Sequence, residues 1–234
     1  MLKKLLALLF AASLCPALAA NEAEIRKAME ERLGTKVDSV TKSGYFGLYE
    51  VYAEGNIFYT DDKVSAIVVG GQLIDGRSMK NVTEERLRKL TAIRFADLPL
   101  ERAIKQVRGD GKRVLATFED PNCGYCKRLA KELLKLDNVT VYVFLYPILS
   151  EDSLRKSKQI WCSADRAKAW NDWMIDGKTP SAREDCDTSA ITRNQDYGRR
   201  LNISGTPTMF FADGERVPGA IPLARIEQKL SQTR

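Results

Sequence analysis

Two cysteines separated by two residues, Cys123 and Cys126, carry the clearest chemical signal in the 234-residue sequence. A C-x-x-C pair serves either as half of a zinc site or as a redox dithiol. Zinc would need two further ligands, but the chain has no histidine, and Cys162 and Cys186 do not form a second C-x-x-C pair. The missing histidine also argues against Ser-His-Asp and Cys-His hydrolysis. The pair therefore predicts thiol–disulfide exchange with no metal and no cofactor.

The residues around the pair predict how its two sulfurs differ. Arg113 to Phe118 is a β-prone apolar run, and the residues after Cys126 have the apolar spacing of a helix. The start of a helix offers free N–H groups and a positive dipole end, which favour an anion. We therefore expect Cys123 to have a lowered pKa and to act as the nucleophile, with Lys127 and Arg128 adding positive charge. Cys126, one turn later, is expected to face inward and to resolve the mixed disulfide.

Tyr125 lies between the two cysteines, where it is expected to tune the dithiol and to contact substrate. A permanent local disulfide, or two incidental thiols, is the alternative for the C-x-x-C pair. The order of strand, C-x-x-C pair and helix favours the redox interpretation.

The remainder of the C-terminal part alternates strands and helices, which is typical of an α/β fold. Leu100 to Val107 is expected to be a short helix. The further expected strands are Val139 to Tyr146, the run that follows Gly205, and Arg216 to Pro218, and the expected helices lie around Ser153 to Asp176, Ala190 to Leu201 and Leu223 to Gln232.

The N-terminal part has a different character. A short amphipathic helix is expected over Glu22 to Leu33, followed by three β-prone runs at Leu48 to Ala53, Asn56 to Thr60 and Val64 to Val69. A small antiparallel sheet of this size has a thin core, and its exposed strand edge offers a means of pairing with a second copy. The sequence therefore predicts an α+β dimerisation domain over residues 20–82.

Thr83 resembles a helix N-cap, because Glu84 and Glu85 follow it and apolar residues then recur at helical spacing. We expect a helix from Thr83 to about Phe95, within a linker over residues 83–98. The catalytic α/β domain is expected over residues 99–234.

The first 19 residues resemble an export signal, with Lys3 and Lys4 before an apolar run that is too short to span a bilayer. Cleavage is expected after Ala19. The net charge is +6, and +4 without the two leader lysines, and it is spread along the chain, which gives nucleic-acid binding little support. Four cysteines remain after cleavage, an even number that suggests disulfides in an exported chain.

The run Phe118 to Lys127, together with Ser204 to Thr208, resembles the thioredoxin fold. The resemblance extends over nearly the whole mature chain and is strongest to the DsbC family of thiol:disulfide interchange proteins. Further matching segments are Arg108 to Lys112, Ile160 to Ser163, Asn81 to Thr83 and Val217 to Gly219. The sequence differs from some members at Lys127, where they carry histidine, so their redox potential and thiolate pKa do not transfer.

This resemblance has specific implications for residues and partners. Pro207 should follow a cis peptide bond and lie against the dithiol, and Thr206 should help to bind substrate backbone. The alternative is an ordinary trans proline. Cys162 and Cys186 should form a structural disulfide, with a second redox site as the alternative.

The resemblance also implies a periplasmic homodimer that acts on unfolded or misoxidised exported proteins and is kept reduced by a membrane electron donor of the DsbD type. The expected function is that of a thiol–disulfide isomerase or reductase. A dithiol oxidase that donates disulfides, and a holding chaperone, are the alternatives.

Overall fold

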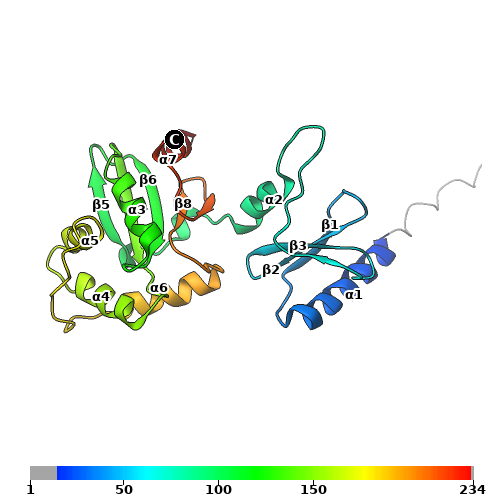
Figure 1. Cartoon of the computed structure of the whole chain (residues 1–234), viewed down its shortest axis with the longest axis horizontal. Helices are drawn as coiled ribbons and strands as arrows, with labels where there is room; N and C mark the ends of the chain where they lie inside the picture. Colours follow the sequence, from blue (N-terminus) through cyan, green and yellow to red (C-terminus); the bar gives the residue numbers. More distant parts are fainter. Residues whose placement is uncertain (1–14, 233–234) are drawn as a thin grey trace, which may run out of the picture. The chain divides into compact units, whose positions relative to one another are not determined.

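The computed structural model of the chain describes residues 15–232, with side chains from Asn21 onward. The chain divides into two compact units, the first ending at Leu87 and the second beginning at Arg88. Their elements are labelled in Figure 1. No helix within residues 15–232 is long and apolar enough to cross a membrane.

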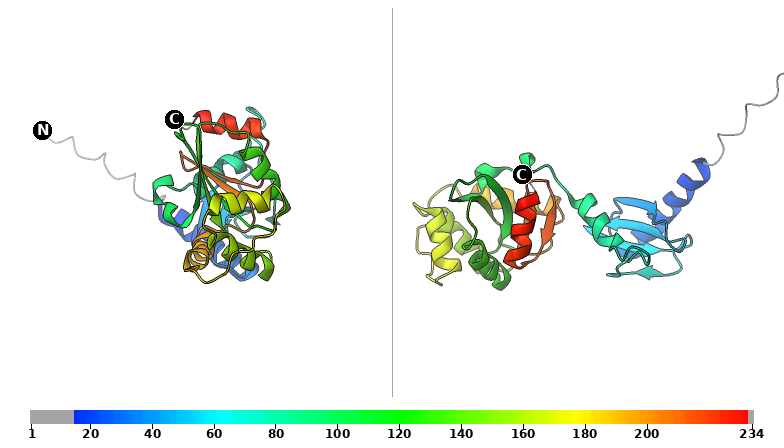
Figure 2. Two further views of the ribbon diagram at one scale, coloured as in Figure 1. Left: turned by 90° about the vertical axis from the view of Figure 1, so that its left-hand side faces the viewer. Right: turned by 90° about the horizontal axis from the view of Figure 1, so that it is seen from above.

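The first unit is a four-stranded antiparallel sheet with one long helix against it. Its elements are α1 (Cys15–Leu33), β1 (Ser39–Lys42), β2 (Tyr49–Ala53), β3 (Asn56–Thr60) and β4 (Ile67–Val68), and the strands follow one another in chain order. Ile25 and Met29 of α1 are buried against Val40 and Val51, and Figure 2 shows α1 along the sheet. Strand β1 was not expected, because its sequence has a single apolar residue between polar ones.

Helix α1 begins earlier than the helix expected from the sequence. It runs through Ala19, after which cleavage was predicted, and residues 1–14 of the predicted leader lie outside the described residues. Cleavage after Ala19 stays a prediction.

Helix α2 (Val82–Thr91) is shorter than expected, and its cap differs from the predicted one. The Asn81 side chain accepts the hydrogen bond from the Glu84 N–H at 3.0 Å, so Asn81 performs the capping role expected of Thr83. The Thr83 hydroxyl is buried and is engaged instead by the Leu73 N–H at 2.8 Å and the Tyr59 hydroxyl at 2.7 Å. After α2 the chain is not helical until the short 3-10 turn η1 (Phe95–Asp97).

The second unit contains a five-stranded mixed sheet in the order β5-β7-β6-β8-β9. Its strands are β5 (Ile104–Arg108), β6 (Arg113–Glu119), β7 (Val139–Leu145), β8 (Thr208–Phe211) and β9 (Arg216–Pro218). Strands β6 and β7 are parallel, and the other neighbouring pairs are antiparallel.

The prediction of a helix over Leu100 to Val107 was wrong. A 3-10 turn, η2 (Leu100–Arg102), precedes β5, in which Ile104 and Gln106 are buried while Lys105 and Val107 are exposed. This alternation has the period of a strand, and pairing with β7 satisfies its backbone groups.

The helices of the second unit follow the expected positions closely. They are α3 (Gly124–Leu133), α4 (Glu151–Trp161), α5 (Arg166–Met174), α6 (Ser189–Arg200) and α7 (Leu223–Gln232). The helical stretch expected around Ser153 to Asp176 is two helices, because α4 ends before Cys162 and Asp165 caps α5 by accepting from the Lys168 N–H at 2.9 Å.

The side chains of strand β6 alternate between the two faces of the sheet. Ala116 and Phe118 point to one face, where the Phe118 ring stacks on Phe144 with centroids 4.7 Å apart. Leu115 lies on the other face, in the core cluster that contains Cys126 and Leu129 of α3. Figure 1 shows α3 in front of this sheet.

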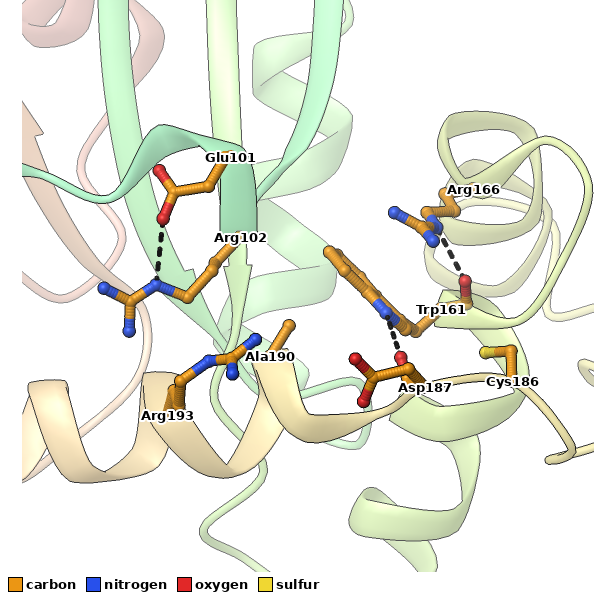
Figure 3. Close-up of a pocket in the computed structure, with 8 residues that line it drawn as sticks. All are labelled: Glu101, Arg102, Trp161, Arg166, Cys186, Asp187, Ala190 and Arg193. Atoms are coloured by element: carbon orange, nitrogen blue, oxygen red, sulfur yellow. Dashed lines mark hydrogen bonds and ion pairs between the residues drawn. The ribbon is translucent and has the colours of Figure 1, made fainter.

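A cavity of about 510 Å³ lies beside the start of α6. It is lined by Glu101, Arg102, Trp161, Arg166, Cys186, Asp187, Ala190 and Arg193 (Figure 3). The Trp161 indole N–H donates to the Asp187 carbonyl at 3.1 Å, and the Arg166 Nε donates to the Trp161 carbonyl at 2.6 Å. The first bond joins the end of α4 to the segment that leads into α6, and the second joins it to the start of α5.

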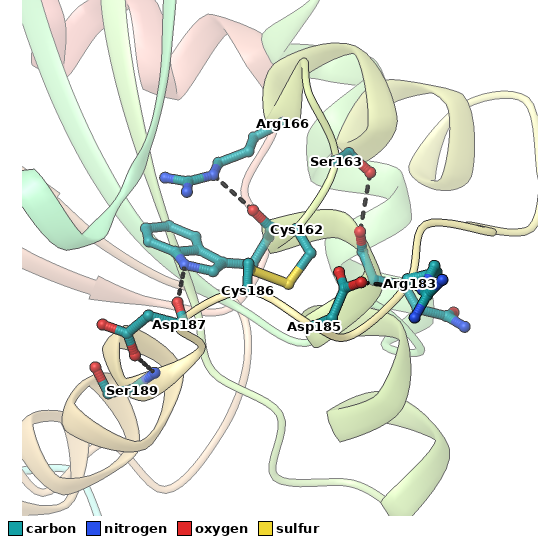
Figure 4. The surroundings of a disulfide bond; sticks show 10 residues. Cys162, Ser163, Arg166, Arg183, Asp185, Cys186, Asp187 and Ser189 are labelled. Carbon is teal, nitrogen blue, oxygen red and sulfur yellow. Dashed lines mark hydrogen bonds and ion pairs between the residues drawn. A yellow bond between two sulfur atoms is a disulfide. The ribbon is translucent and has the colours of Figure 1, made fainter.

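A disulfide joins Cys162, directly after α4, to Cys186, with Cα atoms 5.6 Å apart (Figure 4). It closes a loop over 24 sequence positions that includes α5 and the irregular segment after it. A crosslink over such a loop stabilises a fold chiefly by restricting the unfolded chain.

Glu119, the last residue of β6, is completely buried beside the Thr117 side chain. Burial raises the pKa of this carboxyl from its ordinary 4.5 to about 8. The folded protein therefore holds a proton here that the unfolded chain releases between about pH 4.5 and pH 8.

Removing the disulfide should lower stability without unfolding the chain. In a Cys162→Ala/Cys186→Ala variant we expect the free energy of unfolding to fall by about 3 kcal/mol, measured by urea denaturation. A reductant should shift the midpoint of the parent protein and leave that of the variant unchanged. Coincident midpoints for parent and variant would contradict a stabilising crosslink.

Glu119→Gln should change how stability depends on pH. Because the folded-state pKa is raised, the contribution of Glu119 is fully present below about pH 4.5 and is lost as pH rises through about 8. Relative to the parent protein, the variant should therefore become more stable by about 3 kcal/mol as pH rises from 5 to 8, because the slope reaches its full value of about 1.4 kcal/mol per pH unit only well between the two pKa values. Urea denaturation at both pH values measures this gain.

Glu50→Gln is the control, because Glu50 is buried but ion-paired with Arg86 in the first unit. The Glu50→Gln variant should be less stable than the parent protein at pH 8, because Arg86 loses its carboxylate partner. If the free energies of unfolding of the parent protein and of Glu119→Gln changed in parallel with pH, the assignment of a strongly perturbed carboxyl to Glu119 would be wrong.

Candidate active site

Cys123 lies where β6 has ended and α3 begins, as the sequence predicted. It is the N-cap residue, with extended backbone angles (φ −74°, ψ 119°), and its sulfur accepts the Cys126 N–H at 3.4 Å. The sulfur therefore occupies the place that an oxygen takes in most N-caps. An N–H donor and the positive end of the helix are therefore both directed at this sulfur.

Asp120 fixes the turn that delivers Cys123 to the helix. One carboxylate oxygen accepts from the Asn122 N–H at 2.8 Å, and the other accepts from the N–H groups of Ile148 and Leu149 at 2.8 and 3.0 Å. Asp120 is fully buried, so these bonds lie away from water. The carboxylate joins the turn to the loop after β7, a role that sequence reasoning missed although Asp-Pro-Asn is a typical turn sequence.

The two cysteines are both free thiols but have different surroundings. Cys123 keeps 6% of its surface exposed, and Cys126 keeps none. Burial raises the pKa of the Cys126 thiol far above its ordinary value, and the negative charge of Glu119 raises it further. Of the two sulfurs, only that of Cys123 is therefore accessible to an external disulfide.

Thr206 and Pro207 lie beside the dithiol, although they are far from it in the sequence. The peptide bond between them is cis, and the Cys123 thiol donates to the Thr206 carbonyl at 3.3 Å. The Pro207 carbonyl in turn accepts from the Gly219 N–H at 2.7 Å. The loop before β8 is thus held directly against Cys123.

An apolar surface borders the site, made of Tyr125, Ile148 and Leu149, whose exposed fractions are 58%, 39% and 57%. Ile148 and Leu149 lie in the loop that Asp120 holds, so they belong to the same small region as Cys123. Sequence reasoning named Tyr125 and missed the other two, because an apolar pair after a strand is more often part of a core.

The two basic residues after Cys126 are positioned by aromatic rings. The Lys127 ammonium lies over the Trp173 ring at 4.0 Å, and the Arg128 guanidinium lies over the Tyr125 ring at 4.2 Å. The Trp173 indole N–H donates to the Pro121 carbonyl at 2.6 Å, so α5 also supports the turn before the dithiol.

No group of three or more metal-ligating side chains occurs in residues 15–232. The cavity beside α6 is lined by Cys186 and by neither Cys123 nor Cys126, so it is separate from the dithiol. The arrangement suits exchange between the Cys123 sulfur and an external disulfide.

Comparison with known proteins identifies both units. The model of the thioredoxin-like domain matches residues 100–234, and that of the disulfide bond isomerase protein N-terminal domain matches residues 16–84. The fold class expected from the sequence is therefore confirmed.

Two relatives that match most of the chain are named as thiol:disulfide interchange proteins. A probable thiol:disulfide interchange protein DsbC of Bordetella pertussis is 49% identical over 197 residues, covering 84% of this chain and 69% of the relative. The thiol:disulfide interchange protein DsbC of Escherichia coli K12 is 27% identical over 218 residues, covering 91% and 89%.

Among solved structures, a disulfide interchange protein from Neisseria gonorrhoeae is 41% identical, with a TM-score of 0.54, over 58% of this chain and 98% of that one. The matches to the two domains and to the relatives confirm the family resemblance seen in the sequence. The chain belongs to the DsbC family of thiol:disulfide interchange proteins.

Proposed function

We propose that this thiol–disulfide oxidoreductase reshuffles incorrect disulfides in exported proteins, with Cys123 as the attacking sulfur and Cys126 as the resolving one. The observation that carries the proposal is the difference between the two sulfurs. Cys123 caps α3 and keeps 6% of its surface exposed, whereas Cys126 is completely buried. A reactive thiol needs both an environment that favours its anion and access to substrate.

The first step is attack by the Cys123 thiolate on a substrate disulfide. A bond forms between the Cys123 sulfur and one substrate sulfur, and the other substrate sulfur leaves as a thiolate. If a substrate thiolate then attacks the mixed disulfide, Cys123 is released unchanged and the substrate is isomerised. No electrons are gained or lost in that route.

The second route is reduction. Cys126 attacks the Cys123 sulfur, the Cys123–Cys126 bond forms, and the substrate leaves as a thiol. The substrate is then reduced and the protein is oxidised, so a reductant must restore the dithiol. We assign this role to a membrane electron donor of the DsbD type. We place the exchange in the periplasm, after the leader has been removed by cleavage after Ala19.

Substrate chains are proposed to bind at the surface around Cys123. Thr206 and Pro207 offer backbone groups beside the sulfur, and the Thr206 carbonyl already accepts from the Cys123 thiol. Tyr125, Ile148 and Leu149 supply exposed apolar area, which suits the side chains of unfolded proteins. The relatives named as interchange proteins favour this function over a dithiol oxidase or a holding chaperone.

The N-terminal unit is proposed to form a homodimer. In the described sheet β4 is an edge strand, paired on one side with β3. Apolar residues are exposed on it and in the segment after it: Val68, Val69, Ile74 and Met79. An apolar edge of this kind favours pairing with a second copy of the chain.

Replacing each of the two cysteines should change the activity in a different way. Cys123→Ala should reduce the reactivation of scrambled ribonuclease to the uncatalysed rate, because the attacking sulfur is gone. Cys126→Ala should still attack and should accumulate a mixed disulfide with substrate, visible by mass spectrometry, because the resolving sulfur is missing. Cys162→Ala/Cys186→Ala is the control and should keep most of the activity. Full activity in Cys123→Ala would exclude the proposal.

Charges on the β4 edge should separate the dimer. Val68→Asp/Val69→Asp is expected to halve the native mass, measured by light scattering, because it would bury unpaired carboxylates in the interface. Phe46→Asp is the matched control, since Phe46 is 91% exposed in the turn between β1 and β2. A parent protein with the mass of one chain would rule out the dimer, and dimeric Val68→Asp/Val69→Asp would rule out this edge.

A further inference from the structure

We infer that the site prefers disulfides flanked by acidic residues, because Lys127 and Arg128 hold two positive charges in place near Cys123. This preference rests on the function proposed above and names the class of substrate that the same site takes best. Exchange between two sulfurs requires no charge on the substrate, so the preference is a separate property of the surface around Cys123.

Lys127 lies one turn after Cys123 at the start of α3, where its N–H donates to the Cys123 carbonyl at 3.0 Å. The Lys127 ammonium lies 4.0 Å from the centre of the Trp173 ring. Trp173 is itself anchored to the turn before the dithiol, because its indole N–H donates to the Pro121 carbonyl at 2.6 Å. The ring therefore holds the ammonium near the residues that lead into Cys123.

Arg128 is held by a ring that belongs to the surface of the site. Its guanidinium lies 4.2 Å from the centre of the Tyr125 ring, and Tyr125 is 58% exposed between the two cysteines. Contacts of a cation with an aromatic face at these distances are attractive. They restrict the side chains of Lys127 and Arg128 before a substrate arrives, which reduces the entropy that binding costs.

Neither of these two cations has a carboxylate partner in the described part of the chain. Within residues 21–232, the side chains of Lys127 and Arg128 make no ion pair and no hydrogen bond. Glu132, one turn after Arg128 on α3, pairs instead with Lys135 at 2.9 Å. Two adjacent cations without a counter-charge give an anionic group from outside a favourable place to bind.

The start of α4 brings a carboxylate to the turn before Cys123, but brings its counter-charges as well. The Asp152 carboxylate accepts from the Asn122 side-chain amide at 2.7 Å. It is also paired with the Lys156 ammonium and the Arg155 guanidinium. Asp152 therefore does not neutralise the cations of α3.

The remaining groups around the site leave its surface positive. The Lys156 ammonium lies 4.6 Å from the centre of the same Trp173 ring that holds Lys127. Glu151 is exposed and adds one negative charge, while Glu119 and Asp120 are buried. The two loops that border the dithiol, residues 147–150 and 204–208, contain no ionisable side chain. A substrate therefore meets more positive than negative charge beside Cys123.

This charge distinguishes among chains that the apolar surface accepts equally. Tyr125, Ile148 and Leu149 suit the apolar side chains of any unfolded protein. An acidic residue beside a substrate disulfide approaches Lys127 and Arg128 as the substrate sulfur approaches Cys123. Opposite charges raise the rate at which such partners meet, and like charges lower it.

The test compares three synthetic peptides of equal length, each with one internal disulfide. Glutamate flanks both cysteines in the first peptide, lysine in the second and glutamine in the third. Each is mixed with the reduced, full mature protein at low ionic strength, and oxidation of the Cys123–Cys126 dithiol is followed by acid quenching and mass spectrometry. The rate of the parent protein is divided by that of Lys127→Gln/Arg128→Gln, so that the intrinsic reactivity of each peptide disulfide cancels.

The expected result is a rate ratio that depends on the charge of the peptide. It should be about tenfold higher with the glutamate peptide than with the glutamine peptide, within the range of electrostatic rate enhancements. With the lysine peptide it should be lower than with the glutamine peptide. In about 1 M salt the Debye length falls to about 3 Å, and the three ratios should converge.

Lys112→Gln/Lys135→Gln is the matched control. It removes the same net charge, but Lys112 precedes β6 and Lys135 follows α3, at the ends of these elements that are remote from Cys123. Its three ratios should be equal at low ionic strength. A glutamate preference that fell as much in this control would overturn the inference, because net charge alone would then explain it.

The positioning role of the Trp173 ring has its own pair of variants. Trp173→Phe keeps a ring for the Lys127 ammonium, whereas Trp173→Leu removes it. The preference for the glutamate peptide over the glutamine peptide should therefore be larger in Trp173→Phe than in Trp173→Leu. Equal preferences in the two variants would overturn this role of the ring.

Equal ratios for the three peptides with Lys127→Gln/Arg128→Gln would overturn the preference itself. The two cations would then act on the Cys123 sulfur and not on the substrate, and the proposed exchange reaction would remain intact. A parent dithiol that none of the three peptides oxidised would instead overturn the proposed function.

Discussion

The contact on which the site depends is the hydrogen bond from the Cys126 N–H to the Cys123 sulfur. It makes the sulfur the cap of α3, and it exists because β6 ends at a turn that places Cys123 in an extended conformation. The buried Asp120 carboxylate holds that turn and the loop after β7 together. Capping also sets the direction of the helix, so Cys126 is completely buried while Cys123 keeps 6% of its surface exposed.

The side chains on the two faces of β6 have different roles, one structural and one chemical. One face carries Phe118 in an aromatic cluster that needs no polar groups. The other carries Thr117 and Glu119 toward α3, where the buried carboxyl makes stability fall as pH rises from about 4.5 to about 8. The Glu119 charge is in turn one of the causes that raise the pKa of the Cys126 thiol.

Local patterns predicted much of this arrangement. The C-x-x-C pair and the strand before it located Cys123 at the start of a helix, since both elements have clear periodicity. The same reasoning failed at β5, because Leu100 to Val107 has apolar residues at intervals that suit a helix as well as a strand. The outcome there depends on pairing with β7, which is distant in sequence. Asp120 was also missed as a separate contributor, because only the folded chain shows what its carboxylate contacts.

The central claim, that the two sulfurs of the dithiol are unequal, is tested most directly by alkylation. Reduced native protein treated with iodoacetamide, sampled over time and analysed by peptide mass spectrometry, should be modified rapidly at Cys123 and at Cys126 only after denaturant is added. Equal rates at both cysteines, or a Cys123 as slow as an ordinary cysteine, would contradict the account.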